Sequence, residues 1–225
     1  MTRITLFITG TNTGVGKTVL TALLARYLHE HGVRVAALKP ICSGGRGDAR
    51  VLRAALAGSL TLDEMNPWHF RAPIAPLPAA RRERKRVRLS QVLAHIRMMQ
   101  KRFDVLLIEG VGGLLSPLGE NFDSRDLIGV LRATPIVVCP NRLGAVNQVL
   151  LTIEALPRNA AAKARVVLMS PSRPDSSTGA NANLLGEFFD KGRIFRLPWL
   201  GKRCDARKVL RDSGVRRMLR TSIGM

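Results

Sequence analysis

A glycine-rich segment near the start of the chain constrains the fold more than any other feature. Gly10–Thr18, with the sequence GTNTGVGKT, lies between an apolar run at 4–9 and a stretch at 17–31 whose apolar residues have helical spacing. The run predicts a buried strand, and the stretch predicts a helix that ends at Gly32. Glycines permit a tight turn whose N–H groups converge on one anion, and the helix N-terminus adds its positive end. The segment therefore predicts a phosphate-binding loop.

The last two side chains of this loop indicate its ligand. The Lys17 ammonium can reach the β- and γ-phosphates of a nucleotide, and the Thr18 hydroxyl can bind the accompanying Mg²⁺ ion. Five residues lie between Gly10 and Gly16, whereas the usual loop has four at this place. We interpret the additional residue as the mark of a subgroup of such loops.

Apolar runs and helical patterns alternate along the rest of the chain, which is typical of βαβ units around a parallel sheet. We expect a single domain over residues 1–225 with an α/β P-loop fold, in which a mostly parallel central sheet carries helices on both faces. A last helix at 208–220 is expected to pack on the sheet, with a membrane-surface helix as the alternative. Further strands are expected at 33–38, 104–109, 135–139, 164–169 and 193–197, and helices at 48–57, 89–101, 145–155 and 181–189.

The chain is strongly basic, since 36 Lys and Arg against 16 Asp and Glu give it a formal charge of +20. Such a charge suits nucleic acid or an acidic membrane, but it also suits a site for anionic nucleotides. Aromatic residues make up 4% of the chain, too few for platforms on which bases stack. We therefore expect no nucleic acid partner and no membrane attachment. The basic run 81–88 is expected to be a solvated loop or helix end.

Cysteines and apolar runs indicate the compartment. Cys42, Cys139 and Cys204 are scattered along the sequence, so neither a disulfide framework nor a zinc site is expected. The first apolar run is too short for a signal peptide, and no run approaches the ~20 apolar residues of a membrane span. These patterns favour the cytoplasm.

Two further motifs follow strands whose carboxyl ends form the ligand-binding edge of such a sheet. Lys39 ends the second strand and can add a cation at the phosphates, although a lysine at such a place is often only solvated. Asp48 is the N-cap of the next helix, a ligand of Mg²⁺ or nucleotide, or both. Glu109 ends a buried strand and is followed by the sequence GVGG. A turn explains these glycines, whereas Mg²⁺ binding explains the carboxylate.

Together these motifs resemble the dethiobiotin synthetase family, within the deviant P-loop nucleotidases, over nearly the whole chain. Six blocks in one order are far more specific than any single block. The family's loop occurs at Gly10–Thr18 with Asn12 in place of Asp, Lys-Pro-x-x-Ser-Gly at Lys39–Gly44, Asp-Ala at Asp48–Ala49, Glu-Gly-x-Gly-Gly at Glu109–Gly113, Leu-Gly-x-x-Asn at Leu143–Asn147 and Pro-Trp-Leu at Pro198–Leu200.

The resemblance implies an ATP-dependent ligase of biotin biosynthesis that forms carbon–nitrogen bonds. In this reaction 7,8-diaminopelargonic acid takes up CO₂ as a carbamate, and ATP converts the carbamate to a carbamic-phosphoric anhydride. The second amine then closes the ureido ring of dethiobiotin. The implied ligands are ATP, the diamine, CO₂ or bicarbonate, and Mg²⁺. The implied assembly is a homodimer in which one subunit contributes to the substrate site of the other.

The resemblance also implies roles for the residues of its blocks. The catalytic residues would be Lys17, Lys39, Thr13 and Ser43. The nucleotide would contact Asn12, Thr13, Gly14, Val15, Gly16, Lys17, Thr18, Asp48, Pro198, Trp199 and Leu200. The diamine would contact Lys39, Ser43, Gly110, Val111, Gly112 and Gly113, and across the dimer Leu143, Gly144 and Asn147. Thr18, Asp48 and Glu109 would hold Mg²⁺.

The sequence departs from the family pattern at several places. Members commonly bind adenine with an Asn-Asp pair, which is Met169-Ser170 here, so loose selectivity for the base is expected. Gly14 stands where some members have Glu, and Ala75-Pro76-Leu77 stands where the family has Ser-Pro-His. The connection from Ser43 to Asp48 is unusually short.

Two other functions are compatible with a loop of this kind. A partitioning or division ATPase, a switch that binds DNA or a membrane, would suit the charge. That group has a signature lysine early in the loop, where this chain has Asn12. The synthetase-like domain of cobyrinic acid amidotransferases usually comes with a glutaminase domain, for which the expected sheet pattern leaves no segment.

Overall fold

The computed structural model describes residues 3–201 and 205–224. Its central sheet has six described strands, all parallel, in the order β2-β5-β1-β6-β7-β8. The chain winds to β2 on one side of β1 and to β8 on the other, so the loop after β1 lies where ligands bind in such sheets. The strands are β1 (Ile4–Gly10), β2 (Val35–Leu38), β5 (Val105–Glu109), β6 (Thr134–Pro140), β7 (Arg165–Met169) and β8 (Ile194–Leu197).

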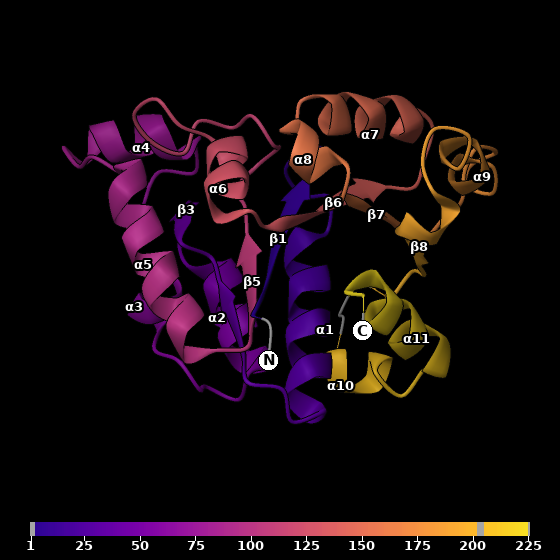
Figure 1. Cartoon of the computed structure of the whole chain (residues 1–225), viewed down its shortest axis with the longest axis horizontal. Coiled ribbons are helices and arrows are strands. Elements are labelled where there is room, and N and C mark those ends of the chain that lie inside the picture. Colours follow the sequence, from indigo (N-terminus) through magenta and orange to yellow (C-terminus); the bar gives the residue numbers. More distant parts are fainter. Residues whose placement is uncertain (1–2, 202–204, 225) are drawn as a thin grey trace.

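Helices cover both faces of the sheet. Helices α1 (Lys17–Glu30) and α11 (Ser213–Ser222) lie on one face, and α6 (Ser124–Leu131) and α8 (Arg158–Ala161) lie on the other (Figure 1). The remaining helices are α2 (Gly47–Ala55), α3 (Leu62–Met65), α4 (Pro76–Arg82), α5 (Leu89–Arg102), α7 (Ala145–Glu154), α9 (Asn181–Leu185), the 3-10 turn η1 (Lys191–Arg193) and α10 (Ala206–Val209).

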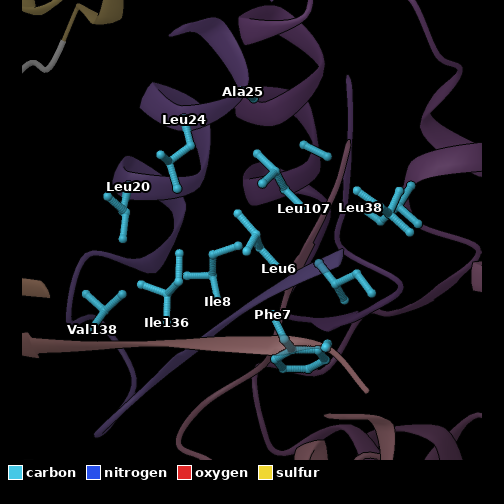
Figure 2. Close-up of a cluster of buried hydrophobic side chains, with 14 of the residues drawn as sticks. Leu6, Phe7, Ile8, Leu20, Leu24, Ala25, Leu38, Leu107, Ile136 and Val138 are labelled. Carbon is cyan, nitrogen blue, oxygen red and sulfur yellow. The ribbon is translucent and has the colours of Figure 1, made fainter. Parts of the chain in front are cut away.

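β1 lies at the centre of the core because both of its faces are covered. Leu6 and Ile8 point toward Leu24 of α1, whereas Phe7 points to the opposite face (Figure 2). The exposed fraction of each of these four side chains is 1% or less. Burial of such a side chain stabilises the fold by about 1.5–3 kcal/mol. The strand that carries the phosphate loop is therefore rigidly held.

A second, two-stranded sheet pairs β3 (Ile41–Ser43) with β4 (Trp68–Phe70) in parallel. Buried Asn66 holds it to the end of β2, because its Nδ2 donates to the backbone oxygen of Lys39 at 2.6 Å. The Asn66 side-chain oxygen accepts from Cys42 Sγ at 3.1 Å. This sheet fixes the segment that leads from Lys39 to Ser43.

The expected fold class is confirmed: a parallel central sheet with helices on both faces. All the predicted strands occur, and so do the predicted helices apart from the one at 208–220, although the strand at 33–38 begins at Val35 and the helix at 181–189 ends at Leu185. The sequence patterns did not predict β3, β4, α3, α4, α6, α8 or η1. Elements this short contain too few residues for a clear period, so neighbouring packing decides their conformation.

The prediction of one continuous helix at 208–220 is wrong, because the structure has two helices there, α10 and α11. The Asp212 carboxylate caps α11 and accepts from the backbone nitrogens of Gly214 at 2.7 Å and Val215 at 3.1 Å. α11 buries Val215 and Leu219 and contacts β8 and α1. The expectation that this segment packs on the sheet is confirmed.

The basic run 81–88 is a helix end followed by a loop, as expected, since α4 ends at Arg82. Cys42 and Cys139 are buried free thiols, and Cys204 lies outside the described residues. Within residues 3–201 and 205–224, no helix has both the length and the apolar character needed to cross a membrane.

Candidate active site

Three of the predicted motifs meet at the carboxyl edge of the sheet. The phosphate loop follows β1, Lys39 follows β2, and Glu109 is the last residue of β5. Because β2, β5 and β1 are neighbours in the sheet, these segments end side by side although they are far apart in sequence. Lys39 and Glu109 are almost completely buried, with exposed fractions of 3% and 1%.

Lys39 joins the two carboxylates of the site. Its Nζ lies 2.6 Å from Glu109 Oε1 and 3.0 Å from Asp48 Oδ2, and it donates to Gly110 O at 2.9 Å. Thr18 Oγ1 donates to the same Glu109 oxygen at 2.7 Å. Burial alone would lower the pKa of Lys39, but Glu109 and Asp48 outweigh it, so the pKa is raised and the ammonium stays charged. Lys39 is therefore not a solvated surface lysine.

Asp48 is the second residue of α2, and Arg46 occupies the N-cap position. The N-cap interpretation of Asp48 is therefore wrong, because the carboxylate reaches Lys39 instead of the backbone of its own helix. Burial acts to raise the pKa of Asp48, but the Lys39 ammonium lowers it below its usual range. An acidic residue in the first turn is also favoured by the helix dipole.

Lys17 holds the loop after β5 against the phosphate loop. Its Nζ donates to Asn12 O at 2.8 Å and to Gly112 O at 2.6 Å. Burial first, and then repulsion by Lys39, lower the pKa of Lys17 to about 8. Both partners of Lys17 are neutral carbonyls, whereas phosphate oxygens would offer stronger, charge-assisted bonds. The amine is thus placed to exchange these carbonyls for an anionic ligand.

Two glycines allow the loops to approach one another. Gly16 has a φ of 101°, and a Cβ at this position would lie 2.7 Å from Met169 Cε. Gly112 has a φ of 64°, and a Cβ there would clash with Ser116 Oγ unless that side chain moved. Both positions combine a left-handed backbone, which favours glycine, with a close approach to another residue's side chain.

A cavity of 720 Å³, the active-site cavity, opens between the phosphate loop and the segments that follow β2 and β5. All four predicted catalytic residues and all three predicted metal ligands line it. Asn12, Val15, Gly110 and Gly113 do not line it but adjoin residues that do; Asn12 Oδ1, for example, accepts from Thr13 N at 2.7 Å. The predicted residues in its lining are Thr13, Gly14, Gly16, Lys17, Thr18, Lys39, Ser43, Asp48, Glu109, Val111 and Gly112.

One wall of this cavity was missed by sequence reasoning. It consists of Pro73, Ile74, Ala75 and Pro76, together with Ser116. The Ala-Pro-Leu segment at 75–77 stands at a block of the resembled family, so that block could have indicated the wall. Ser116 lies in an irregular loop, and the sequence around it carries no comparable signal.

The donor set fits a Mg²⁺ ion that is held mainly through a nucleotide. Glu109 Oε2 is buried and has no hydrogen-bond partner among the described residues. Thr18 and Asp48 line the same cavity. Mg²⁺ commonly binds one or two carboxylates and completes its shell with phosphate oxygens and water. The part of the chain that the structure describes contains no group of three or more His, Cys, Asp or Glu that could form a full protein cage.

A second cavity of 420 Å³, the β7–β8 cavity, lies beyond the ends of β7 and β8. Of the predicted Pro198–Leu200 block, Pro198 lines it, whereas Trp199 is 50% exposed and Leu200 packs against the core. The Met169 side chain lies where a Cβ on Gly16 would be, and Met169 directly precedes the lining residue Ser170, so this cavity lies near the phosphate loop. Its lining is Asn141, Ser170, Pro174, Asp175, Thr178, Gly179, Arg196 and Pro198.

The predicted residues Leu143, Gly144 and Asn147 line neither cavity. They lie at the exposed start of α7, where the exposed fraction of Leu143 is 81%. Within one chain, the structure therefore does not bring this block to the active-site cavity.

Comparisons with known proteins identify relatives of this chain. A family model described as an AAA domain matches residues 4–207. The ATP-dependent dethiobiotin synthetase of Anaeromyxobacter dehalogenans is 37% identical, over 86% of this chain and 89% of its own length. That of Methanocaldococcus jannaschii is 37% identical, over 73% of this chain and 78% of its own length.

A solved structure shares the fold. The ParA family ATPase from Chlorobium tepidum superposes with a TM-score of 0.58 over 97% of this chain and 96% of its own, at 11% sequence identity. At this identity the likeness concerns the fold alone. The curated relatives, by contrast, match in sequence over most of the chain, and with the family model they confirm the resemblance read from the six blocks. The chain belongs to the family of ATP-dependent dethiobiotin synthetases.

Proposed function

We propose that this chain is an ATP-dependent dethiobiotin synthetase, which carboxylates 7,8-diaminopelargonic acid and closes the ureido ring. The observation that carries the proposal is the buried Lys39–Glu109 pair at the phosphate loop of a chain of this family. A phosphate loop alone supplies one lysine, here Lys17. A second, permanently charged lysine in the same cavity supports phosphoryl transfer to an anionic acceptor such as a carbamate.

The chemistry needs one CO₂ and one ATP for each ring. One amine of the substrate attacks CO₂ and loses a proton, which gives a carbamate. A carbamate oxygen attacks the γ-phosphorus, ADP leaves, and a carbamic-phosphoric anhydride results. The second amine attacks the anhydride carbon and loses a proton, and phosphate departs with the bridging oxygen.

The residues of the active-site cavity supply position and charge for these steps. Lys17 binds the β- and γ-phosphates, and Lys39 binds the carbamate and the phosphoryl group in transfer. The hydroxyls of Thr13 and Ser43 donate to the same oxygens. Thr18, Asp48 and Glu109 hold Mg²⁺, which neutralises charge on the phosphates. Gly110–Gly113 let the diamine approach the phosphate loop.

We further propose that the enzyme works as a homodimer. Leu143 and Leu151 are 81% and 63% exposed on neighbouring parts of α7 and its preceding loop, which supports contact with a second copy. In the dimer, the block Leu143, Gly144 and Asn147 would complete the diamine site of the other subunit. The base of ATP would lie beside Pro198–Leu200. We treat residues 1–225 as one domain, and the free thiols suit the reducing cytoplasm.

Omission of single reactants tests the proposal. Phosphate release is measured with ATP, Mg²⁺, the diamine and bicarbonate, and then with each component left out in turn. We expect release only in the complete mixture, together with one dethiobiotin for each phosphate. Release that ignores the diamine would contradict the proposal, and a rate stimulated by DNA or liposomes would favour a partitioning switch instead.

A further inference from the structure

The β7–β8 cavity has an unusual balance of free hydrogen-bonding groups. Its carboxylate is already used, because Asp175 Oδ1 accepts from Ser177 Oγ at 2.7 Å and from Thr178 N at 2.9 Å. Asp175 Oδ2 accepts from Leu143 N at 2.8 Å. This side chain closes its own loop and ties that loop to the start of α7, so most of its acceptor capacity is used within the chain.

The amide in the cavity is used as well. Asn141 is 1% exposed; its Nδ2 donates to Thr178 O at 3.0 Å, and its Oδ1 accepts from Asn181 Nδ2 at 2.9 Å. The Thr178 hydroxyl contacts Asn141 O at 3.2 Å and Asp175 Oδ1 at 2.9 Å. Because Asn141 is buried and held by these bonds, it is poorly placed to read the edge of a base.

Two polar side chains of the lining are left. Neither Arg196 nor Ser170 has a side-chain hydrogen bond or ion pair within residues 3–201 and 205–224. Arg196 alternates with buried Phe195 and Leu197 on β8, so it is exposed at the cavity. A guanidinium has five hydrogen-bond donors and no acceptor, whereas a hydroxyl can donate or accept a hydrogen bond. The free side-chain groups thus favour a ligand edge with acceptors.

Purine bases differ in the acceptors that they present at position 6 and N7. The edge of guanine or hypoxanthine offers two acceptors, O6 and N7, which match the fork of an arginine, whereas adenine offers the N7 acceptor beside the N6 amine. We propose that Arg196 makes this cavity selective for 6-keto purines, so that GTP and ITP serve as phosphoryl donors at least as well as ATP. This inference rests on the proposed function in one respect: the base of the nucleotide lies in the β7–β8 cavity.

The test compares ATP with ITP, which differ at position 6 of the base and in the proton on N1. With diamine, bicarbonate and Mg²⁺, kcat/KM for ITP is expected to equal or exceed that for ATP. Arg196→Gln presents both a donor and an acceptor, which suit adenine, and should move the ITP-to-ATP ratio toward ATP by at least about tenfold. Arg193→Gln is the matched control, because Arg193 lies outside the lining of the cavity; its ratio should equal that of the parent chain.

Equilibrium binding of IDP and ADP separates this inference from the proposed function, because it needs neither the diamine nor turnover. Tighter binding of IDP in the parent chain, reversed in Arg196→Gln, supports the inference whether or not the ring is formed. Tighter binding of ADP than of IDP in the parent chain, or a higher kcat/KM for ATP than for ITP, would overturn it. The inference would also be overturned if Arg196→Gln changed neither the IDP-to-ADP binding ratio nor the ITP-to-ATP turnover ratio.

Discussion

Lys39 Nζ lies 2.6 Å from Glu109 Oε1, and the two side chains are 4% and 0% exposed. A pair this deeply buried costs solvation energy that its attraction offsets only while both partners are present. The pair therefore keeps the Lys39 ammonium charged at the end of β2, next to the phosphate loop. Under the proposed function, the Lys39 ammonium would bind the anionic acceptor beside the nucleotide.

Loss of one partner of this pair should destabilise the chain strongly. Lys39→Met leaves the Glu109 carboxylate buried without its cation, and the free energy of unfolding is expected to fall by about 3–5 kcal/mol. Lys39→Met combined with Glu109→Leu should recover much of the loss, because neither charge remains. Denaturant unfolding measures both. Arg81→Met, which breaks a solvent-exposed pair with Glu120, is the control and should change little; equal losses in single and double variants would contradict the coupling.

Lys17→Ala should abolish turnover without unfolding the chain. Removal of one positioned donor that stabilises charge in the transition state typically lowers kcat by about 10²–10³-fold. The fold should persist, because Lys17 is buried beside Lys39, whose like charge already disfavours it. Phosphate release and thermal unfolding are the measurements. A kcat near that of the parent chain would refute the role of this loop.

Binding of ATP should weaken as the pH rises above about 8, because burial and Lys39 lower the pKa of Lys17 from 10.5 to about 8. Between these two values the unfolded chain binds the proton and the folded chain does not, so this group makes folding more favourable as pH rises there. The triphosphate needs the charged amine, so binding there takes up a proton. Calorimetry in buffers of different ionisation enthalpy measures that uptake. Lys17→Arg should remove it, and an uptake unchanged in that variant would assign it to another group.

Mixed dimers can show whether the substrate site is shared. Lys17→Ala and Asn147→Ala should each be inactive alone, but a re-equilibrated equal mixture should regain up to about a quarter of the parent activity. Half of its dimers are mixed, and each of these has one intact site of two. A mixture of Lys17→Ala with Thr18→Ala is the control and should stay inactive, because both residues belong to the same subunit's cavity. Equal recovery in the two mixtures would contradict a shared site.

The sequence alone predicted the parts of the fold with strong periodicity. β1, β5, α1 and α5 lie where their apolar spacing indicated, because a buried strand and an amphipathic helix impose different periods. α6 was missed although Asp123 and Asp126 form a capping box at its start. The break between α10 and α11 was missed because the cap at Asp212 competes with the apolar pattern on either side.

The site was predicted in its chemistry more than in its contacts. The order of motifs was enough to place Lys39 and Glu109 at one sheet edge, because parallel strands end together. Sequence gave no sign that Asp48 would reach Lys39, or that Lys17 would donate to Gly112 O. Such contacts depend on how far loops approach, and Gly112 and Ser116 set that distance through packing. The β7–β8 cavity was missed for the same reason, except at Pro198 and at Ser170, which stands at the family's adenine-binding pair.

The origin of the oxygen in released phosphate tests the central claim most directly. The enzyme is given ¹⁸O-labelled bicarbonate, the diamine, ATP and Mg²⁺. The ¹⁸O content of the released phosphate is then measured by mass spectrometry, before the label in bicarbonate exchanges with water. A carbamic-phosphoric anhydride requires that each phosphate carry one labelled oxygen and that none be released without the diamine. Unlabelled phosphate, or equal release in the absence of the diamine, would contradict the account.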